Sequence, residues 1–156
     1  MDPAHVPTLG QFRCGGSTKY EAEVDTLAAD VHTGNHSFLH VRVAEDPASG
    51  VLIGFCATQP RQFPGDPDAA YVALIGVNAP FRGGRDHNGS RFGDVLLDDA
   101  LRTIERCWGG PPRPPIWALV APDNTASHSL FERHGFALIQ GTAGGYDIRY
   151  AAREMP

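Results

Sequence analysis

A loop rich in glycine and arginine, PFRGGRDHNGSRFG at residues 80–93, stands directly before an amphipathic stretch that predicts a helix. An apolar run, YVALIGV at 71–77, precedes the loop and is typical of a strand buried on both faces. A strand, a glycine loop and a helix N-terminus together form an anion site, because backbone N–H groups and the positive end of the helix dipole face the ligand. Arg82, Arg85 and Arg91 add charge that suits phosphate groups. The loop therefore predicts phosphate binding, with a solvated turn as the simpler alternative.

Two general nucleotide-binding patterns do not account for this loop. The dinucleotide pattern G-x-G-x-x-G is absent from it. The nucleoside triphosphate pattern is approached by Gly84 and Gly89, four residues apart, but Ser90 and Arg91 follow where that pattern needs a lysine for the terminal phosphates. Neither nucleotide class is favoured.

The elements that must position this loop follow from hydrophobic periodicity and turn residues. Ser17 or Thr18 could cap a first helix that Gly34 ends, and Gly135 closes the last one. The expected elements are an irregular segment at 1–18, a helix at 19–31, strands at 37–45, 51–59 and 70–78, a helix at 90–107, a strand at 116–122, a helix at 125–135, and strands at 136–140 and 146–152. Without repeats or a linker, residues 1–156 read as one α/β (α+β) domain with a mixed sheet.

The composition bounds the class of protein. The chain has 156 residues, a formal net charge of -5, 42% hydrophobic and 20% charged residues, which argues against a nucleic-acid protein with a broad basic face. No apolar run approaches the length of a membrane span, and MDPAHVPTLGQF has no apolar core of a signal peptide. Cys14, Cys56 and Cys107 are odd in number and far apart, which favours reduced thiols in the cytoplasm and no metal site.

Three segments, taken in order, resemble the GNAT family of N-acetyltransferases over roughly residues 12–150. Asn88–Gly93 is similar to the family's Q/R-x-x-G-x-G/A motif, which cradles the pyrophosphate of acetyl-coenzyme A (acetyl-CoA). Gly93 fills the last glycine, whereas Asn88 and Arg91 depart from the motif and an insertion precedes it. LLDDAL at 96–101 looks like the helix that follows the motif. APDNTASHSLFERHGF at 121–136 looks like the family's V-x-x-x-N-x-x-A-x-x-L-Y-x-x-x-G-F segment.

The resemblance implies a mostly antiparallel sheet with a central splayed strand pair flanked by helices. Acetyl-CoA would be the co-substrate, its pantetheine arm bonding to the backbone of the strand at 71–77, and no metal would take part. The residues that the resemblance assigns to acetyl-CoA are Ile75, Val77, Asn88, Gly89, Ser90, Arg91, Phe92, Gly93, Asp94, Asn124 and Phe131.

Acetyl transfer to an amine needs a neutral amine, a donor for the negative charge that develops on the carbonyl oxygen, and stabilisation of the departing thiolate. By resemblance, the backbone N–H of Val77 is that donor and the attack is direct. Phe131 stands where the family has the tyrosine that protonates the thiolate. Tyr71 and Ser129 are the candidate replacements, and Tyr146 lies on a closing strand. No carboxylate lies within the strand at 71–77 to relay the proton of the amine.

These observations predict an acetyl-CoA-dependent N-acetyltransferase acting on a primary amine of a small molecule or an aminoacyl group. The acceptor is expected between the first helix and the loops at 60–69 and 141–145, and the apolar closing strands suit a homodimer, as GNAT domains often pair through edge strands.

Two alternatives stay open. Phe12, Cys14 and Gly15 resemble the F-x-C-G start of the family's toxin branch, which acetylates aminoacyl-tRNA and pairs with an antitoxin, although packing into the core explains a phenylalanine and a cysteine equally well. The acidic chain and Phe131 argue against the toxin. The degenerate Asn88 and Arg91, the insertion and Phe131 favour instead an acyl-CoA-binding module without catalysis.

Overall fold

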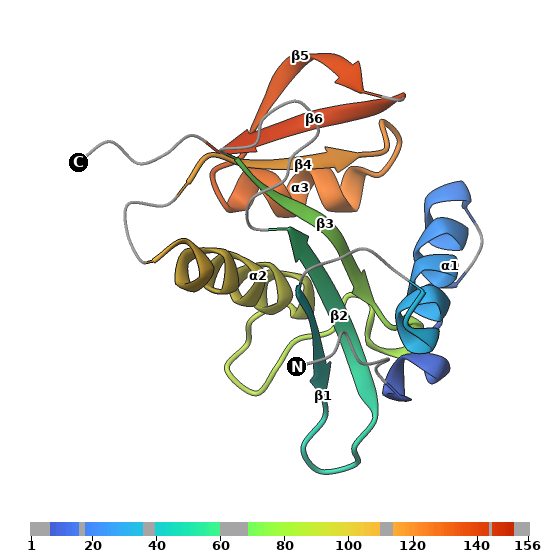
Figure 1. Ribbon diagram of the computed structural model, residues 1–156. Coiled ribbons are helices and arrows are strands. Elements are labelled where there is room, and N and C mark those ends of the chain that lie inside the picture. Colours follow the sequence, from blue (N-terminus) through green and yellow to red (C-terminus); the bar gives the residue numbers. More distant parts are fainter. Residues whose placement is uncertain are drawn as a thin grey trace.

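The computed structural model describes residues 7–15, 18–35, 40–59, 69–109, 114–143 and 145–151 (Figure 1). The elements are the 3-10 helix η1 (Pro7–Gln11), α1 (Lys19–Thr33), β1 (His40–Glu45), β2 (Leu52–Gln59), β3 (Ala70–Val77), the 3-10 helix η2 (Ala79–Phe81), α2 (Phe92–Trp108), β4 (Ile116–Val120), α3 (Thr125–Arg133), β5 (Ala137–Ala143) and β6 (Tyr146–Ala151). The predicted order of helices and strands is confirmed. The segment expected to be irregular contains η1, and the expected loop at 60–69 lies almost wholly outside the described residues.

One six-stranded sheet has the order β1-β2-β3-β4-β6-β5. The pairs β1–β2, β2–β3, β4–β6 and β5–β6 are antiparallel, and β3–β4 is parallel. The mixed, mostly antiparallel sheet expected from the sequence is therefore confirmed, and its single parallel pair lies at the centre.

The two faces of the sheet carry separate cores. On one face, α1 and η1 pack through Leu9, Phe12, Val24 and Val31 onto β2 and β3. On the other face, α2 and α3 cover β3 and β4. The apolar residues of that second core include Val72, Leu97, Leu101, Ile104, Ile116, Val120, Leu130, Phe131 and Phe136. In Figure 1, α1 and α2 flank β2 and β3 from opposite sides.

The central strands diverge after a short contact. β3 and β4 pair only from Ala70 with Ile116 to Val72 with Ala118. At the next position, Ala73 is left without a partner on β2, because Ala57 pairs with Leu74 and Thr58 with Val72. Such a bulge bends a strand and strengthens its twist. The bulge thus coincides with the point where β3 leaves β4, and it produces the splayed pair that the resemblance implied.

Local signals fix the ends of α1 as predicted. The hydroxyl of Thr18 accepts from the amide of Glu21 (3.3 Å), and the Glu21 carboxylate accepts from the amide of Thr18 (3.0 Å), which forms a capping box. Gly34 closes the helix with a φ of 77°. Within the described part of the chain, no helix combines the length and apolar character that crossing a bilayer requires.

Candidate functional site

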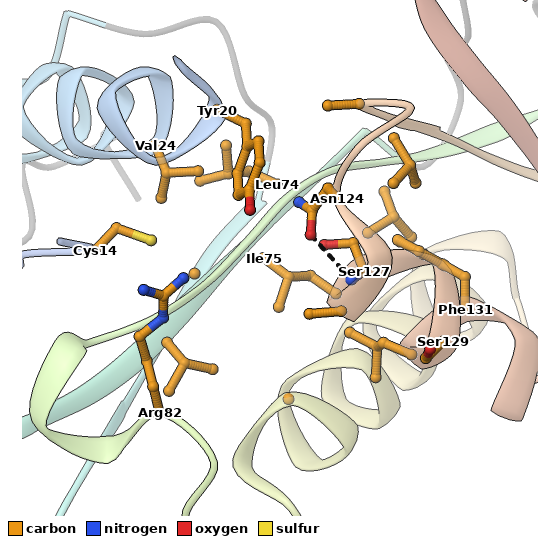
Figure 2. A pocket seen from close by; sticks show the side chains of 18 of the residues that line it. Cys14, Tyr20, Val24, Leu74, Ile75, Arg82, Asn124, Ser127, Ser129 and Phe131 are labelled. Carbon is orange, nitrogen blue, oxygen red and sulfur yellow. Dashed lines mark hydrogen bonds between the residues drawn. The ribbon is translucent and has the colours of Figure 1, made fainter. Parts of the chain in front are cut away.

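A pocket of ≈ 680 Å³ opens where β3 and β4 diverge. Its walls come from both faces of the sheet, because α1 supplies one side and α3 and the start of α2 supply the other. Figure 2 shows Cys14, Tyr20 and Val24 on one side of β3 and Asn124 and Phe131 on the other. The pocket therefore forms a slot between the two strands, with walls on both faces of the sheet.

The edge of β3 along this slot presents backbone donors. The amide of Asn78 donates to the carbonyl oxygen of Ile53 on β2 (2.7 Å). Since amides along an antiparallel strand alternate between its two sides, those of Ile75 and Val77 point away from β2, into the gap that β4 leaves. The register with β2 agrees with this alternation, because Ile75 pairs with Cys56 and Val77 with Gly54. Ile75 and Val77 thus lie where the sequence predicted a backbone-binding edge.

The N-terminus of α2 opens toward the same pocket. Arg91 is its N-cap and makes no side-chain cap hydrogen bond. The amide of Phe92 is 3.4 Å from the carbonyl oxygen of Gly84, whereas the amides of Gly93 and Asp94 have no acceptor among the described residues. A Cβ atom on Gly93 would lie 3.7 Å from Leu130, at the pocket wall. Uncapped amides at the positive end of a helix dipole favour an anion there.

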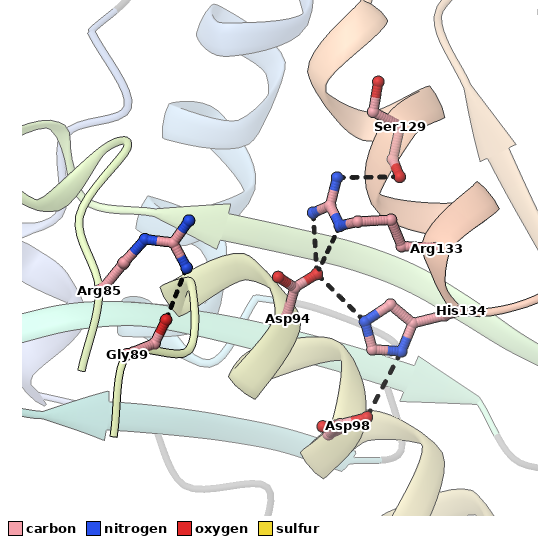
Figure 3. A network of polar contacts seen from close by, with 7 residues as sticks. All are labelled: Arg85, Gly89, Asp94, Asp98, Ser129, Arg133 and His134. Carbon is pink, nitrogen blue, oxygen red and sulfur yellow. Dashed lines mark hydrogen bonds and ion pairs between the residues drawn. The ribbon is translucent and has the colours of Figure 1, made fainter. Parts of the chain in front are cut away.

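The preceding loop does not contribute to this anion site as expected. The carboxylate of Asp86 accepts from the amides of Asn88 (2.9 Å) and Ser90 (2.8 Å), and the Asp86 carbonyl accepts from that of Gly89 (3.0 Å). Arg85 donates to the carbonyl oxygen of Gly89 (2.6 Å; Figure 3). Asn88, Gly89 and Ser90 are exposed and do not line the pocket. Because their amides are already engaged, we remove these three from the candidate site and keep Arg91, Phe92, Gly93 and Asp94.

Arg82 lines the pocket and is held in place by an ion pair with a buried carboxylate. Its guanidinium lies 2.5 Å from the Glu21 carboxylate, whose side chain is only 4% exposed. The pKa of Arg82 is raised, because the hydrogen bond and charge of Glu21 outweigh the effect of burial. Burial raises the pKa of the neighbouring Cys14 thiol, against the opposing effect of Arg82. The capping box of α1 thus orients an arginine at the edge of the pocket.

The side chain of Asp94 joins α2 to α3, which leaves only its backbone amide as a candidate for ligand binding. Its carboxylate lies 2.8 Å from Arg133 and 3.2 Å from His134, and His134 also contacts Asp98 (3.4 Å; Figure 3). Burial raises the pKa of Asp94, but the hydrogen bonds from Arg133 and His134 outweigh it and lower the pKa below its ordinary value. This network holds the first turn of α2 against the last turn of α3.

The residues at α3 to which the resemblance and the chemistry assigned roles, Asn124, Ser129 and Phe131, line the pocket. Asn124 caps α3 by accepting from the amide of Ser127 (3.1 Å). Phe131 lines the pocket from within the core, 6% exposed, with its ring 5.0 Å from that of Phe136. Ser129 also lines the pocket, but unlike Phe131 it is exposed to solvent. No phenol therefore takes the place of Phe131 on α3.

Tyrosines reach the pocket from other elements. Tyr71 lines it from β3, and burial raises its pKa. Tyr146 lines it from β6, and its hydroxyl donates to the Glu23 carboxylate on α1 (2.6 Å). That hydrogen bond is the main reason why the pKa of Tyr146 is raised, followed by burial. Sequence reasoning missed Glu23 and Tyr20; their spacing of three on the pocket face of α1 was the available signal.

Two of the N-terminal residues that resemble the toxin branch pack into the core. Phe12 and Cys14 are 1% and 7% exposed and belong to the core beneath α1. Asn78, just after β3, accepts from the amide of Arg13 (2.9 Å) and donates to the carbonyl oxygen of Leu52 (2.9 Å). The N-terminal segment is thereby fixed beside the end of β3. The toxin likeness itself stays a prediction.

Comparisons with known proteins agree with this geometry. Residues 10–136 match the family model described as the acetyltransferase (GNAT) family. A solved structure from Desulfovibrio desulfuricans, assigned to the GNAT family, is 21% identical with a TM-score of 0.56, covering 88% of this chain and 84% of that one. A GNAT-family acetyltransferase from Listeria monocytogenes is 19% identical with a TM-score of 0.56, covering 87% of this chain and 77% of that one.

A third solved structure contains a ligand. The PaiA N-acetyltransferase from Thermoplasma acidophilum, in complex with coenzyme A, is 14% identical with a TM-score of 0.52, covering 85% of this chain and 70% of that one. A protein from Pyrococcus horikoshii is 18% identical with a TM-score of 0.54 over 69% of this chain, which spans only 62% of its length. No curated protein matches the sequence. The family model spans the splayed strands, the start of α2 and α3, and the chain therefore belongs to the GNAT family of acetyltransferases.

Proposed function

We propose that this protein is an acetyl-CoA-dependent N-acetyltransferase that transfers an acetyl group directly to a primary amine. One observation carries the proposal: the slot between β3 and β4 connects the uncapped N-terminus of α2 with a pocket on the face of α1. A donor bound from the side of α2 and α3 and an acceptor bound from the side of α1 would meet inside the slot. The related PaiA structure holds coenzyme A.

The residues present fit the acetyl-CoA group. The amides of Gly93 and Asp94 would bind the pyrophosphate, and Arg91 and Arg82 would add positive charge beside it. Gly93 suits this place because a side chain there would enter the pocket wall beside Leu130. Asn88, Gly89 and Ser90 have no part in this proposal, since Asp86 engages their amides.

The direction of β3 indicates which part of acetyl-CoA each of its two slot-facing amides would bind. Val77 is the last residue of the strand and the nearer of the two along the chain to the N-terminus of α2, whereas Ile75 lies two residues back toward the bulge. The thioester is the end of the pantetheine arm farthest from the pyrophosphate. We therefore assign the amide of Ile75 to the developing charge on the carbonyl oxygen and that of Val77 to the arm, in place of the role expected for Val77.

Direct transfer agrees with the state of Cys14 and Cys56. Burial raises the pKa of Cys56 to about 12, with Asp99 adding to the effect, and burial also raises that of Cys14. Thiols held in the protonated form are poor nucleophiles. When bound, acetyl-CoA supplies an activated acetyl group on a thiol whose ordinary pKa is about 8.5, so that the sulfur can leave without an acid in the position of Phe131.

A calorimetric titration of the protein with acetyl-CoA, with ATP as the control ligand, tests the donor site. We expect acetyl-CoA to bind with micromolar affinity and ATP to bind at least tenfold more weakly. A thiol-release assay with a panel of primary amines then tests transfer. Absence of acetyl-CoA binding would refute the proposal, and binding without turnover across the panel would replace it with an acyl-CoA-binding module.

A further inference from the structure

The part of the pocket beside α1 contains residues that have no role in the proposed binding of acetyl-CoA. Three tyrosines, Tyr20, Tyr71 and Tyr146, and one carboxylate, Glu23, line it from α1, β3 and β6. Tyr20 and Glu23 are three residues apart on α1 and so share one face of the helix. We call these four residues the tyrosine–glutamate subsite.

The carboxylate of Glu23 has one oxygen engaged and one that lacks a strong partner among the described residues. Its Oε2 accepts from the Tyr146 hydroxyl at 2.6 Å. Its Oε1 lies 4.0 Å from Nζ of Lys19, whose side chain is 88% exposed. Such solvent-exposed pairs contribute little and are easily exchanged. Since the pKa of Tyr146 is raised, this phenol keeps its proton and remains a donor to Glu23.

Two further residues of the pocket, Tyr71 and Arg82, do not cancel the charge of Glu23. Burial raises the pKa of Tyr71, so its ring is neutral near pH 7. Arg82 lies within electrostatic range of Tyr20, and its charge is paired with the buried Glu21 at 2.5 Å. Aromatic rings around a carboxylate favour a cation, because their faces are electron-rich and the carboxylate supplies the opposite charge.

We propose that the tyrosine–glutamate subsite binds a second positive group of the acceptor, and that the acceptor is a diamine. This inference rests on the proposed function. A carboxylate favours the protonated form of a neighbouring amine, whereas the amine that attacks must be neutral. The cation on Glu23 is therefore not the reacting amine. Tyr71 and Ile75 lie opposite Gln59 and Cys56 on β2, which are three residues apart, because the bulge at Ala73 takes up one position. The distance along the strand is therefore roughly 10 Å, which leaves room for a short aliphatic chain between the two amines.

The chemical step leaves the bound cation unchanged. The neutral nitrogen at the far end of the diamine attacks the thioester carbonyl carbon, where a C–N bond forms and the C–S bond breaks. The electron pair of the broken bond goes to sulfur, which leaves as the thiolate and takes up a proton, and the proton released by the amine passes to solvent. The product is a monoacetylated diamine with one positive charge.

Binding without acetyl-CoA tests the subsite independently of catalysis. Titrations of the full chain with 1,4-diaminobutane and with butylamine, followed by the NMR signals of the tyrosine rings, measure the preference for the second charge. We expect the diamine to bind at least tenfold more tightly. Glu23→Gln should remove this preference while keeping an acceptor for the hydroxyl of Tyr146, and Glu45→Gln, on exposed β1, should keep it. Equal affinities in the wild type, or a preference that survives Glu23→Gln, would overturn the proposal.

Steady-state kinetics separate a binding role from a structural one. We expect Glu23→Gln to raise KM for 1,4-diaminobutane at least tenfold, with kcat and the turnover of butylamine little changed, and Glu23→Asp to restore part of the loss. A fall in kcat alike for both amines would mean that Glu23 only supports the fold, and the proposal would fall. If acetyl-CoA does not bind, the proposed function is refuted. The diamine titration, which needs no acetyl-CoA, still tests the subsite independently.

Discussion

Replacement of Gly93 by valine tests whether the pyrophosphate binds at the first turn of α2 or at the loop that precedes this helix. A Cβ atom at Gly93 meets Leu130 at 3.7 Å, an ordinary contact, so the fold should accept it. The two methyl groups of valine would then occupy the space in front of the amides of Gly93 and Asp94. Losing one charge-assisted hydrogen bond to a phosphate costs about 1.5–3 kcal/mol. We therefore expect Gly93→Val to weaken acetyl-CoA binding about 10- to 150-fold.

The matched variant introduces the same side chain three residues earlier. Ser90 is exposed and its amide is held by Asp86, so Ser90→Val should leave the affinity for acetyl-CoA within about twofold of the wild type, since its backbone hydrogen bond persists. Calorimetry gives both affinities, and thermal unfolding should show no loss of stability for Gly93→Val, because glycine is the poorer helix former. Equal effects of the two variants, or a larger effect at Ser90, would refute our placement of the cradle at the first turn of α2.

Three further predictions follow from contacts of the described residues. Phe131→Tyr places a phenol on the pocket wall and should raise turnover in a thiol-release assay at saturating amine, by up to about 100-fold; unchanged turnover would mean that the thiolate leaves without an acid. A Cβ atom at Gly54 would overlap the carbonyl oxygen of Gly76, so Gly54→Ala should lower the free energy of unfolding in urea by about 1–3 kcal/mol, whereas Gly93→Ala should not. Because the folded-state pKa of Asp94 is lowered, its contribution to stability is present above the ordinary aspartate pKa of about 3.9 and is lost as the pH falls through the lowered value. Asp94→Asn should therefore cost about 1 kcal/mol at pH 7, and its unfolding curve should converge with that of the wild type in acid; a gap that persists there would contradict the assignment.

Local patterns allowed most of the fold to be predicted from the sequence. The capping box at Thr18, the glycine after α1 and the 3.6-residue spacing of apolar side chains each depend on neighbours along the chain, and they placed the helices within a few residues of their observed ends. The alternation of β1 and the apolar run of β3 placed the strands in the same way. Family resemblance added the splayed pair, which no local pattern encodes.

The site was harder to predict because its contacts join distant segments. The sequence near Asn88 and Ser90 does not predict that the carboxylate of Asp86 accepts hydrogen bonds from their amides, since many loops contain an aspartate without such a turn. The hydrogen bond between Tyr146 and Glu23 joins residues 123 positions apart. Such pairs depend on how α1 and β6 lie across the sheet, and that arrangement is a property of the whole fold.

The unpaired residue at Ala73 makes the two halves of β3 opposite in phase. Val72, before it, packs against α2, whereas Leu74, after it, packs against α1. Deleting Ala73 would give an unbroken ladder with β2, because Val72 and Leu74 already pair with the adjacent residues Thr58 and Ala57. The residues at 74–77 would keep their register and their faces, and the strand would lose the bend and the added twist of the bulge. A single extra residue thus bends β3 away from β4, and the evolution of this chain can shorten or lengthen its loops far more freely than this strand.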